Sequence, residues 1–484
     1  MPDLRSTANG LPDNSSNQSH CNENRRDDSR RGFIRGSSLL LAGALPAAGV
    51  VSVAAAASQT GTFSNTGELK VGLVGCGYRG IAAASELLTA TATTVPLRLT
   101  ALADAFPDRL QQAVRTLRGR FGDRVTAAAN SRHVGLRAFE SVLASDVDVV
   151  LLATPPVFRP AHFEAAIAAQ KHVYAESPIA VDMPGIDRFQ TALASAQSQR
   201  LAVAVGLLPR YQPRYQLAIS HLRQGAIGQI LSVQVLHPSV ARKTAAGPRS
   251  LTDFQVQLRQ WSEHPWASGG GVVEQRVRGL DVVNWLLDSH PLEARRAACS
   301  GGSNSQPGDI LEFLYPDAIK LRSATASGSS GSGKNAMITI QGSQGWSDLT
   351  AGKIFNARNE LVWRADDALL EATSQLADAA LAAGDVAEST APKCFVGNVG
   401  CGGLWNDFLT AVVGGQRSSL GPSLGPFQRA AVASAAIDST RTAILGRMAS
   451  QAQRPISWED CLCSNEAFAC IGTSNSTLAL TAID

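Results

Sequence analysis

The residues best suited to chemistry form a glycine-rich turn with the spacing G-x-G-x-x-G. Its six members are Gly75, Cys76, Gly77, Tyr78, Arg79 and Gly80. The apolar run 70–74 before the turn predicts a buried strand, and residues 81–88 after it predict a helix. In such a turn the first glycine allows a tight bend, the second lets a pyrophosphate approach the backbone, and the third lets helix and strand pack closely. The turn therefore predicts a dinucleotide site at the start of that helix.

A single acid, Asp104, follows the next predicted strand, residues 97–103. A carboxylate at this position accepts hydrogen bonds from the adenosine ribose and repels a 2′-phosphate. The order strand, glycine turn, helix, strand and acid is more specific than the glycines alone. We therefore expect NAD as the cofactor, with NADP as the alternative.

The glycine turn and Asp104 belong to a longer stretch, residues 68–208, in which predicted strands and helices alternate. Such alternation is typical of a doubly wound parallel sheet. Ligands bind outside the carboxyl ends of the strands in this fold. Two further strand ends carry candidate cofactor-binding residues, namely Thr154, Pro155, Glu176 and Pro178. We expect all these groups to lie along one edge of an N-terminal NAD(P)-binding Rossmann domain.

The pattern changes after residue 208. Residues 209–458 predict a second α/β domain with a largely antiparallel open sheet. Its predicted strands are residues 229–236, 292–298, 310–315, 318–324 and 337–341, and its predicted helices are residues 279–287 and 428–448. We expect this domain to bind the substrate and to mediate oligomerisation, with residues 459–484 as a tail.

Residues 1–57 predict an export signal and leader rather than part of the fold. Arg30 and Arg31 lie in the twin-arginine pattern of residues 29–35, and an apolar stretch and a run of small residues follow. The apolar stretch is too short and too rich in Ala and Gly to predict a membrane span. We therefore expect a periplasmic or otherwise exported protein that crosses the membrane folded, with its nucleotide tightly bound.

Composition argues against several other functions. The 484 residues carry a formal net charge of only +3 and no long basic run, so we expect no nucleic-acid partner. The cysteines lack the paired spacing of a zinc site and the histidines are scattered, so we expect no metal. Cys461, Cys463 and Cys470 either form a disulfide or stay reduced, and their spacing does not decide between the two.

Several of these segments together resemble the glucose–fructose oxidoreductase/inositol dehydrogenase (Gfo/Idh/MocA) family over residues 68–458. The resemblance is carried by residues 75–80, 103–104, 154–155, 171–178, 225–228 and 269–285. Residues 273–285 look like a subgroup common among exported bacterial members. The resemblance implies oxidation or reduction of a sugar or cyclitol carbon with NAD or NADP, in a homodimer or homotetramer.

The same resemblance places three catalytic positions. The family's lysine falls at Ser177, its acid at Glu274 and its histidine at Arg278. An arginine stays protonated and cannot exchange a proton as histidine does. Loss of one acid–base group typically costs about a hundred- to ten-thousand-fold in rate. Glu274 is then either the remaining proton acceptor or an ion-pair partner of Arg276 or Arg278.

Candidate substrate residues are Arg210 and Tyr211, which follow the last strand of the first domain, and Asp281. Arg259, Trp261 and Trp266 either line a sugar pocket or belong to the core. Three functions follow from these patterns. The first is an oxidoreductase acting on a CH–OH group. The others are a catalytically degenerate nucleotide- or sugar-binding protein and an NAD-dependent glycosidase.

Overall fold

The computed structural model describes residues 68–90, 96–238, 251–297, 310–325, 336–365, 400–413, 426–452 and 454–468. All of them lie in one compact unit, Gly61–Asp484. The predicted leader, residues 1–57, and the last part of the predicted tail, residues 469–484, lie outside the described residues. The export prediction is therefore not addressed by the structure.

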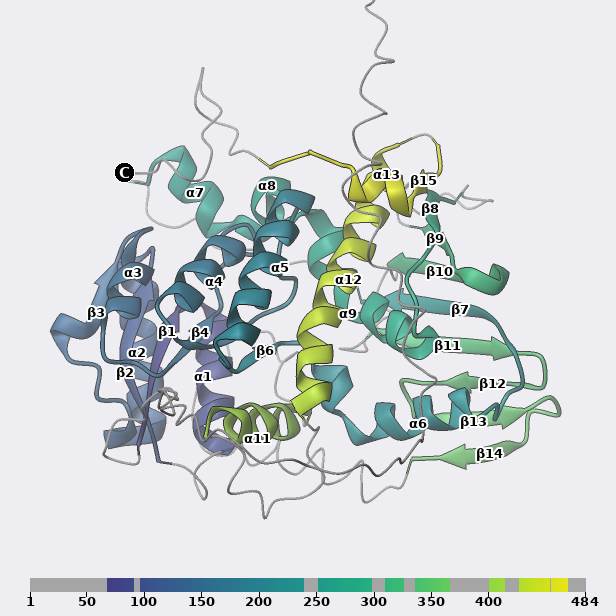
Figure 1. Ribbon diagram of the computed structural model, residues 1–484, viewed down its shortest axis with the longest axis horizontal. Helices are drawn as coiled ribbons and strands as arrows, with labels where there is room; N and C mark the ends of the chain where they lie inside the picture. The colour runs from purple at the N-terminus through teal and green to yellow at the C-terminus, as the bar shows by residue number, and fades with distance from the viewer. Residues whose placement is uncertain are drawn as a thin grey trace, which may run out of the picture. The chain divides into compact units, whose positions relative to one another are not determined.

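A six-stranded sheet forms the first half of the described chain, with the strand order β3-β2-β1-β4-β5-β6 and every pair parallel. Its strands are β1 (Leu69–Val74), β2 (Leu97–Asp104), β3 (Arg132–Val134), β4 (Val149–Leu152), β5 (His172–Ala175) and β6 (Val203–Val205). Its helices are α1 (Tyr78–Ala90), α2 (Pro107–Phe121), α3 (Ala138–Ala144), α4 (Arg159–Ala168) and α5 (Met183–Ser198). This confirms the predicted doubly wound sheet (Figure 1).

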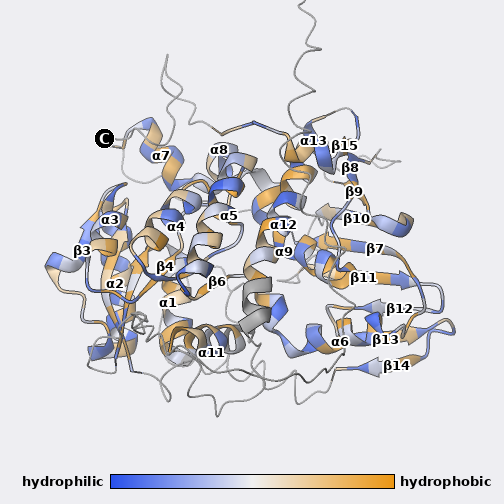
Figure 2. Cartoon of the chain, viewed as in Figure 1, coloured by the Kyte–Doolittle hydropathy of each residue, from blue (hydrophilic) through white to orange (hydrophobic). Residues whose placement is uncertain are grey.

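The central strands of this sheet are buried on both faces, which explains their continuous apolar sequence. All four residues of β4 are buried, as are most residues of β1, and Figure 2 shows β4 as hydrophobic. The helices between the strands begin at recognisable signals. For example, the Asp182 side chain caps α5 by accepting a hydrogen bond from the Gly185 amide at 2.9 Å.

A nine-stranded sheet forms the second half, in the order β14-β13-β12-β11-β7-β10-β9-β8-β15. Its strands are β7 (Ile230–His237), β8 (Glu293–Arg296), β9 (Leu311–Leu314), β10 (Lys320–Thr325), β11 (Met337–Gly342), β12 (Gly345–Asp348), β13 (Lys353–Asn356), β14 (Leu361–Arg364) and β15 (Ile456–Ser457). Only β7 and β10 pair in parallel, so the prediction of a largely antiparallel sheet is confirmed.

The helices of this half are α6 (Pro213–Arg223), α7 (Asp253–Arg259), α8 (Pro265–Ser268), α9 (Gly270–Leu287), α11 (Gly400–Val412), α12 (Pro426–Gln451) and α13 (Trp458–Leu462). The 3₁₀ turn η3 (Leu208–Tyr211) connects β6 to α6, and a second one, η4 (Trp261–Glu263), separates α7 from α8. Strand β7 alternates buried Val233 and Val235 with exposed Gln234 and Leu236, so one face of this sheet is covered and the other open.

Helix α12 connects the two sheets. It contacts α5 and β6 on one side and β8 and β9 on the other, and it packs along α9 (Figure 1). Buried hydrogen bonds fix α9 in place. Asn284 donates to the Thr442 hydroxyl at 2.9 Å and accepts from the Tyr315 hydroxyl at 2.6 Å.

The helix predicted over residues 279–287 is longer than expected, because α9 begins at Gly270. Adjacent glycines usually interrupt a helix, so residues 269–271 carry no local signal for one. Buried Val273 and Val277 nevertheless continue the apolar face of the helix toward its start. The extension matters because it adds Glu274 and Arg278 to one rigid element.

Candidate active site

The glycine turn after β1 has the backbone geometry that its spacing predicts. Gly75 has φ +95°, and a Cβ there would lie 2.7 Å from the Ala153 carbonyl carbon. A Cβ on Gly80 would lie 1.8 Å from the Gly75 carbonyl oxygen, so only glycine allows this contact. By contrast, no heavy atom lies within 4 Å of the position where Gly77 would carry a Cβ. This open position gives a pyrophosphate access to the backbone, so the residues present fit a dinucleotide.

The two residues between these glycines differ in exposure. Cys76 is buried and its backbone amide donates to Asp104 Oδ2 at 2.7 Å. Burial raises the pKa of the Cys76 thiol, so this group packs as a neutral side chain. Tyr78 is exposed and begins α1.

Asp104 lies at the carboxyl end of β2, where the ribose contact was predicted. Its two carboxylate oxygens accept hydrogen bonds from the amides of Cys76, at 2.7 Å, and Phe106, at 2.8 Å. Burial raises its pKa, and these two hydrogen bonds partly oppose that effect. Since a carboxylate accepts about four hydrogen bonds, the ribose interaction is compatible with this second role of joining β2 to the glycine turn.

The side chain of Arg79 extends toward β5. Its Nε donates to Glu176 Oε1 at 2.6 Å, and its Nη1 donates to Glu86 Oε1 at 2.9 Å. The pKa of Arg79 is raised, because Glu176 and Glu86 outweigh the effect of burial. The Arg79 side chain therefore connects the glycine turn with Glu176.

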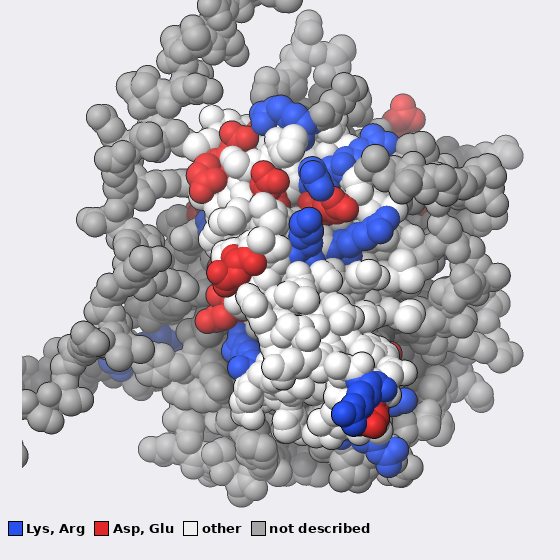
Figure 3. Space-filling view, turned by 90° about the vertical axis from the view of Figure 1, so that its right-hand side faces the viewer, with Lys and Arg blue, Asp and Glu red and all other residues white. Residues whose placement is uncertain are grey.

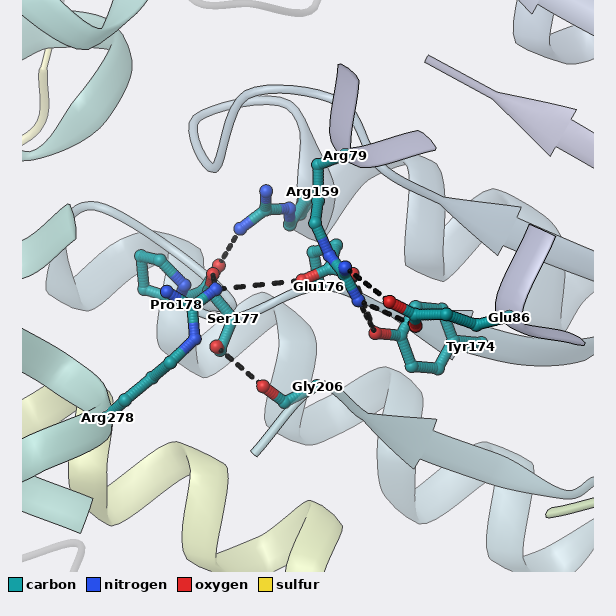
Figure 4. Close-up of polar contacts among 9 residues, drawn as sticks. All are labelled: Arg79, Glu86, Arg159, Tyr174, Glu176, Ser177, Pro178, Gly206 and Arg278. Carbon is teal, nitrogen blue, oxygen red and sulfur yellow. Dashed lines mark hydrogen bonds and ion pairs between the residues drawn. The ribbon is translucent and has the colours of Figure 1, made fainter. Parts of the chain in front are cut away.

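Glu176 follows β5 and is almost fully buried. It accepts a hydrogen bond from the Tyr174 hydroxyl at 2.6 Å, and Arg278 Nη2 lies 3.7 Å from its Oε2 (Figure 4). Burial raises the pKa of Glu176, but the charges of Arg79 and Arg278 outweigh this and hold it below its ordinary value. Glu176 is therefore ionised and binds two arginines from different parts of the chain.

Ser177 stands where the resemblance implies a lysine. Its side chain is buried and donates a hydrogen bond to the Gly206 carbonyl at 3.0 Å. The peptide bond to Pro178 is cis. The Ser177 hydroxyl therefore makes its hydrogen bond within the protein. The carbonyls of Ser177 and Pro178 accept hydrogen bonds from side chains of other helices.

Arg278 brings a positive charge to this turn from α9. Its Nη2 donates to the Ser177 carbonyl at 3.5 Å, and one third of the side chain is exposed. Glu274 precedes it by one helical turn and therefore lies on the same face of α9. The Arg278 guanidinium, from α9, therefore contacts position 177, where the resemblance implies a lysine.

Arg159, which was not among the predicted site residues, also contacts this turn. It is buried at the start of α4, and its Nη1 donates to the Pro178 carbonyl (Figure 4). Burial lowers its pKa to about 10, against the opposing charges of Glu274 and Glu176. A cation in the first turn of a helix opposes the helix dipole, and that is the signal by which the sequence could have indicated it.

Thr154, on the loop after β4, is held by a histidine. Its hydroxyl lies 3.2 Å from His162 Nδ1 on α4. Burial lowers the pKa of His162 to about 3, so the imidazole is neutral near pH 7 and serves as a packed hydrogen-bonding group. Pro155 stands beside Thr154, and its carbonyl accepts the Phe158 amide at 3.0 Å.

Two of the predicted substrate residues, Arg210 and Asp281, contact each other. Arg210 donates to both carboxylate oxygens of Asp281, which is fully buried and also accepts from the Ser439 hydroxyl at 2.7 Å. Tyr211 is buried in η3. These contacts give Arg210 and Asp281 a structural role, because they hold α9 against η3 and α12.

Among the described residues, no group of three or more His, Cys, Asp or Glu side chains is arranged to hold a metal ion. Within the same part of the chain, no helix is long and apolar enough to cross a membrane. Cys461 is free and buried, whereas Cys463 is disulfide-bonded, so the two neighbouring cysteines of the predicted tail differ in state.

The six-stranded sheet with its glycine turn matches a known family. Residues 69–206 fit the family described as an oxidoreductase family with an NAD-binding Rossmann fold, Gfo/Idh/MocA. Over these residues the chain matches the Gfo/Idh/MocA family.

Similar proteins extend the comparison. Inositol 2-dehydrogenase from Acidothermus cellulolyticus is 29% identical over 258 residues, which are 53% of this chain and 63% of that protein. Inositol 2-dehydrogenase from Rhizobium meliloti is 24% identical over 56% of this chain and 68% of that protein. The chain thus spans about two thirds or less of the curated relatives it matches.

Solved structures share the fold over most of the chain. A myo-inositol dehydrogenase from Lactobacillus casei, in complex with NAD(H) and myo-inositol, has a TM-score of 0.52 at 15% identity. It covers 80% of this chain and 96% of its own. An NAD-binding oxidoreductase from Klebsiella pneumoniae has a TM-score of 0.55 at 17% identity, covering 81% and 99%. At these identities the likeness shows that both sheets share one known architecture.

Proposed function

We propose that the protein is an NAD(H)-dependent oxidoreductase that acts on a CH–OH group of a sugar or cyclitol. The observation that carries this proposal is the meeting of α9 with the turn after β5. Helix α9 brings Arg278 to the Ser177 carbonyl, with Glu274 one turn away, at the sheet edge that also bears the open Gly77. Support comes from the relatives named as inositol dehydrogenases.

The residues present define how NAD would be held. The amides of Gly77 and Tyr78 would bind the pyrophosphate, and Asp104 the adenosine ribose. Thr154, Pro155 and the turn from Glu176 to Pro178 would border the nicotinamide half. When bound, NAD supplies the two-electron oxidant for the alcohol.

The chain's own residues would manage the proton and the developing charge. Oxidation of a CH–OH group requires an acceptor for the hydroxyl proton, and the Glu274 carboxylate is the acceptor that α9 offers. Arg278 remains a cation throughout and would stabilise negative charge on the substrate oxygen. The charges of Glu274 and the buried Arg159 attract each other, and Glu274 thereby opposes the effect of burial on the pKa of Arg159.

A second candidate is a protein that binds nucleotide or sugar without turning it over. The hydrogen bond from Ser177 to Gly206 favours it, since this hydroxyl serves the fold. Ser177 and Arg278 favour it as well, because they stand where the resemblance implies a lysine and a histidine, and neither a serine nor an arginine is suited to exchange a proton near neutral pH.

One experiment separates these functions. The protein, expressed with its leader, would be denatured and its released nucleotide identified by chromatography and mass. Native protein would then be offered sugars and cyclitols while NADH is followed by absorbance. Bound NAD together with turnover supports the oxidoreductase, and bound NAD without turnover on a broad panel supports the second candidate. Protein that holds no nucleotide and binds none contradicts the oxidoreductase and leaves sugar binding as the remaining form of the second candidate. NAD-dependent release of nitrophenol from aryl glycosides would instead identify a glycosidase.

We also propose export by the twin-arginine route, on the basis of Arg30 and Arg31. A protein exported after folding would carry its nucleotide with it. Replacing both arginines with lysine should leave the protein inside the cell. Unchanged delivery to the periplasm, measured by cell fractionation, would contradict this proposal.

We further propose that the open face of the nine-stranded sheet joins subunits in a homodimer or homotetramer. Exposed Leu236 of β7 lies opposite exposed Met337 of β11, and Leu361 and Val362 are exposed on β14. Figure 3 shows a broad area without charged side chains on the side of the molecule that bears this sheet. Light scattering should report more than one subunit, and Leu236→Glu should shift the protein to a monomer.

A further inference from the structure

A segment of the second half of the chain lies on the strand-end edge of the first sheet. This segment, residues 251–268, contains α7, η4 and α8. Arg259 at the end of α7 binds both carboxylate oxygens of Asp108 in the first turn of α2, at 2.9 and 2.6 Å. In return, Arg109 Nη2 donates to the Arg259 carbonyl at 2.9 Å. Two reciprocal contacts thus hold this segment, the 251–268 segment, beside the loop after β2.

Apolar contacts extend the same attachment across the sheet edge. Phe106, Val157 and Val181, from the loops after β2, β4 and β5, form one buried cluster with Leu258, Trp266 and Ala267 of the 251–268 segment. The Arg259 guanidinium also lies over the Phe106 ring, 4.5 Å from its centroid. The Val157 amide donates to the Ala267 carbonyl at 3.3 Å. The segment is therefore attached at three strand ends.

These strand ends are where a dinucleotide lies in this fold. Asp104, the predicted ribose acceptor, is two residues before Phe106 and only 9% exposed. We propose that the 251–268 segment encloses the adenosine half of the bound nucleotide, so that release requires the segment to detach. Arg259 and Asp108 are then the contacts that retain the cofactor. This inference rests on the proposed function, because it requires a nucleotide at this edge.

The end of the segment is built to allow such detachment. Gly269 and Gly270 follow α8 directly, with φ of +75° and +81°. Two consecutive glycines in this region of conformational space can change direction at low steric cost. The segment can therefore turn about this point while α9 stays fixed by its contacts with α12. From the sequence, Trp261 and Trp266 either line a sugar pocket or belong to the core. In the structure both belong to the 251–268 segment.

Release of NADH tests this inference directly. Protein loaded with NADH is mixed with excess NAD, and the fluorescence of bound NADH is followed over time. The variants are Arg259→Gln, Asp108→Asn and the exchange of the two charges, Asp108→Arg with Arg259→Asp. Arg295→Gln is the matched control, since Arg295 makes a similar 2.8 Å pair with Glu312 in the other sheet. Thermal unfolding of each variant reports whether it is folded.

We expect release to be about tenfold faster or more in each single variant, because a bidentate charge-assisted contact is lost. The charge exchange should slow release again, and Arg295→Gln should behave as the wild type. Equal release rates in folded single variants would overturn the inference while leaving nucleotide binding intact. Tighter binding in Arg259→Gln would also overturn it, because the segment would then occupy the adenosine position instead of covering it. Absence of binding in every protein, the wild type included, would overturn the proposed function and this inference together.

Discussion

Two turns at the same sheet edge use different parts of the chain to form their site. The turn after β1 is defined by backbone: Gly75 and Gly80 permit close contacts, and Gly77 leaves open space. The turn after β5 is defined by side chains that reach it from α1, α4 and α9, namely Arg79, Arg159 and Arg278. A site formed by backbone groups tolerates few substitutions. A site formed by side chains can obtain the same chemical groups from residues on other helices or strands.

The turn after β5 obtains its positive charge from side chains of other elements. Where the resemblance implies a lysine, Ser177 is neutral, but two guanidinium groups donate to the carbonyls of Ser177 and Pro178. Glu176 and Glu274 balance part of that positive charge. The positive charge at this turn therefore comes from α9 and α4. The comparison of the two turns suggests variants that should affect one turn and spare the other.

The largest effect is expected for Glu274→Gln. The amide cannot accept the hydroxyl proton, so turnover should fall by about a hundred- to ten-thousand-fold. Nucleotide binding at the glycine turn should not change. Steady-state rates and NAD titration measure the two separately, and Glu312→Gln on β9 serves as the control. Full turnover in Glu274→Gln would show that the acceptor lies elsewhere.

Glu176→Gln should have the next largest effect, on stability. Removing this buried carboxylate leaves Arg79 and Arg278 without their shared partner, at a cost of about 3 kcal/mol in the free energy of unfolding. Because the pKa of Glu176 is lower in the folded state than in the unfolded state, its contribution is complete above its ordinary pKa of 4.5. The contribution is lost as the pH falls through the folded-state pKa.

Urea unfolding at several pH values checks this expectation. The difference between wild type and Glu176→Gln should be largest near neutral pH and should shrink below pH 4.5. Glu140→Gln, which removes an exposed ion pair with Arg137, should change stability by less than about 1 kcal/mol at any pH. A difference that does not depend on pH would mean that the charge of Glu176 is not what stabilises this turn.

Two glycine variants distinguish fold from ligand binding at the first turn. Gly80→Ala should destabilise the protein by about 2–3 kcal/mol, because its Cβ meets the Gly75 carbonyl oxygen. Gly77→Ala should stay within about 0.5 kcal/mol of the wild type, since its Cβ meets nothing. It should nevertheless weaken NAD binding about tenfold or more, because the methyl group fills the approach to the backbone. Unfolding curves and NAD titration of both variants measure this, and unchanged binding in Gly77→Ala would move the pyrophosphate away from this turn.

The same contrast explains what the sequence could predict. The first turn was predictable because its requirements are local: a strand, three glycines and a helix within a dozen residues. For the turn after β5, the sequence predicted where the turn lies but not which side chains reach it. Arg278, for example, is 101 residues away from Ser177 along the chain. No local pattern indicates that α9 extends back to Gly270. The cation in the first turn of α4 singles out Arg159 but does not say that its side chain turns toward Pro178. The sequence predicted the position of several candidate residues at strand ends, whereas the direction of each side chain depended on tertiary packing.

The smallest effect is expected for Ser177→Ala. This variant tests whether the Ser177 hydroxyl contributes to turnover at the turn after β5. The Ser177 hydroxyl donates only to the Gly206 carbonyl, so its loss should cost about 1 kcal/mol of stability. Turnover and NAD binding should stay at wild-type levels, because the positive charge at this turn comes from Arg278 and Arg159. Steady-state kinetics and unfolding curves of Ser177→Ala and Arg278→Gln, compared side by side, measure this. If Ser177→Ala loses turnover as Arg278→Gln is expected to, then the hydroxyl acts on the substrate. Position 177 would in that case have the catalytic role that we propose for Arg278 and Glu274 of α9.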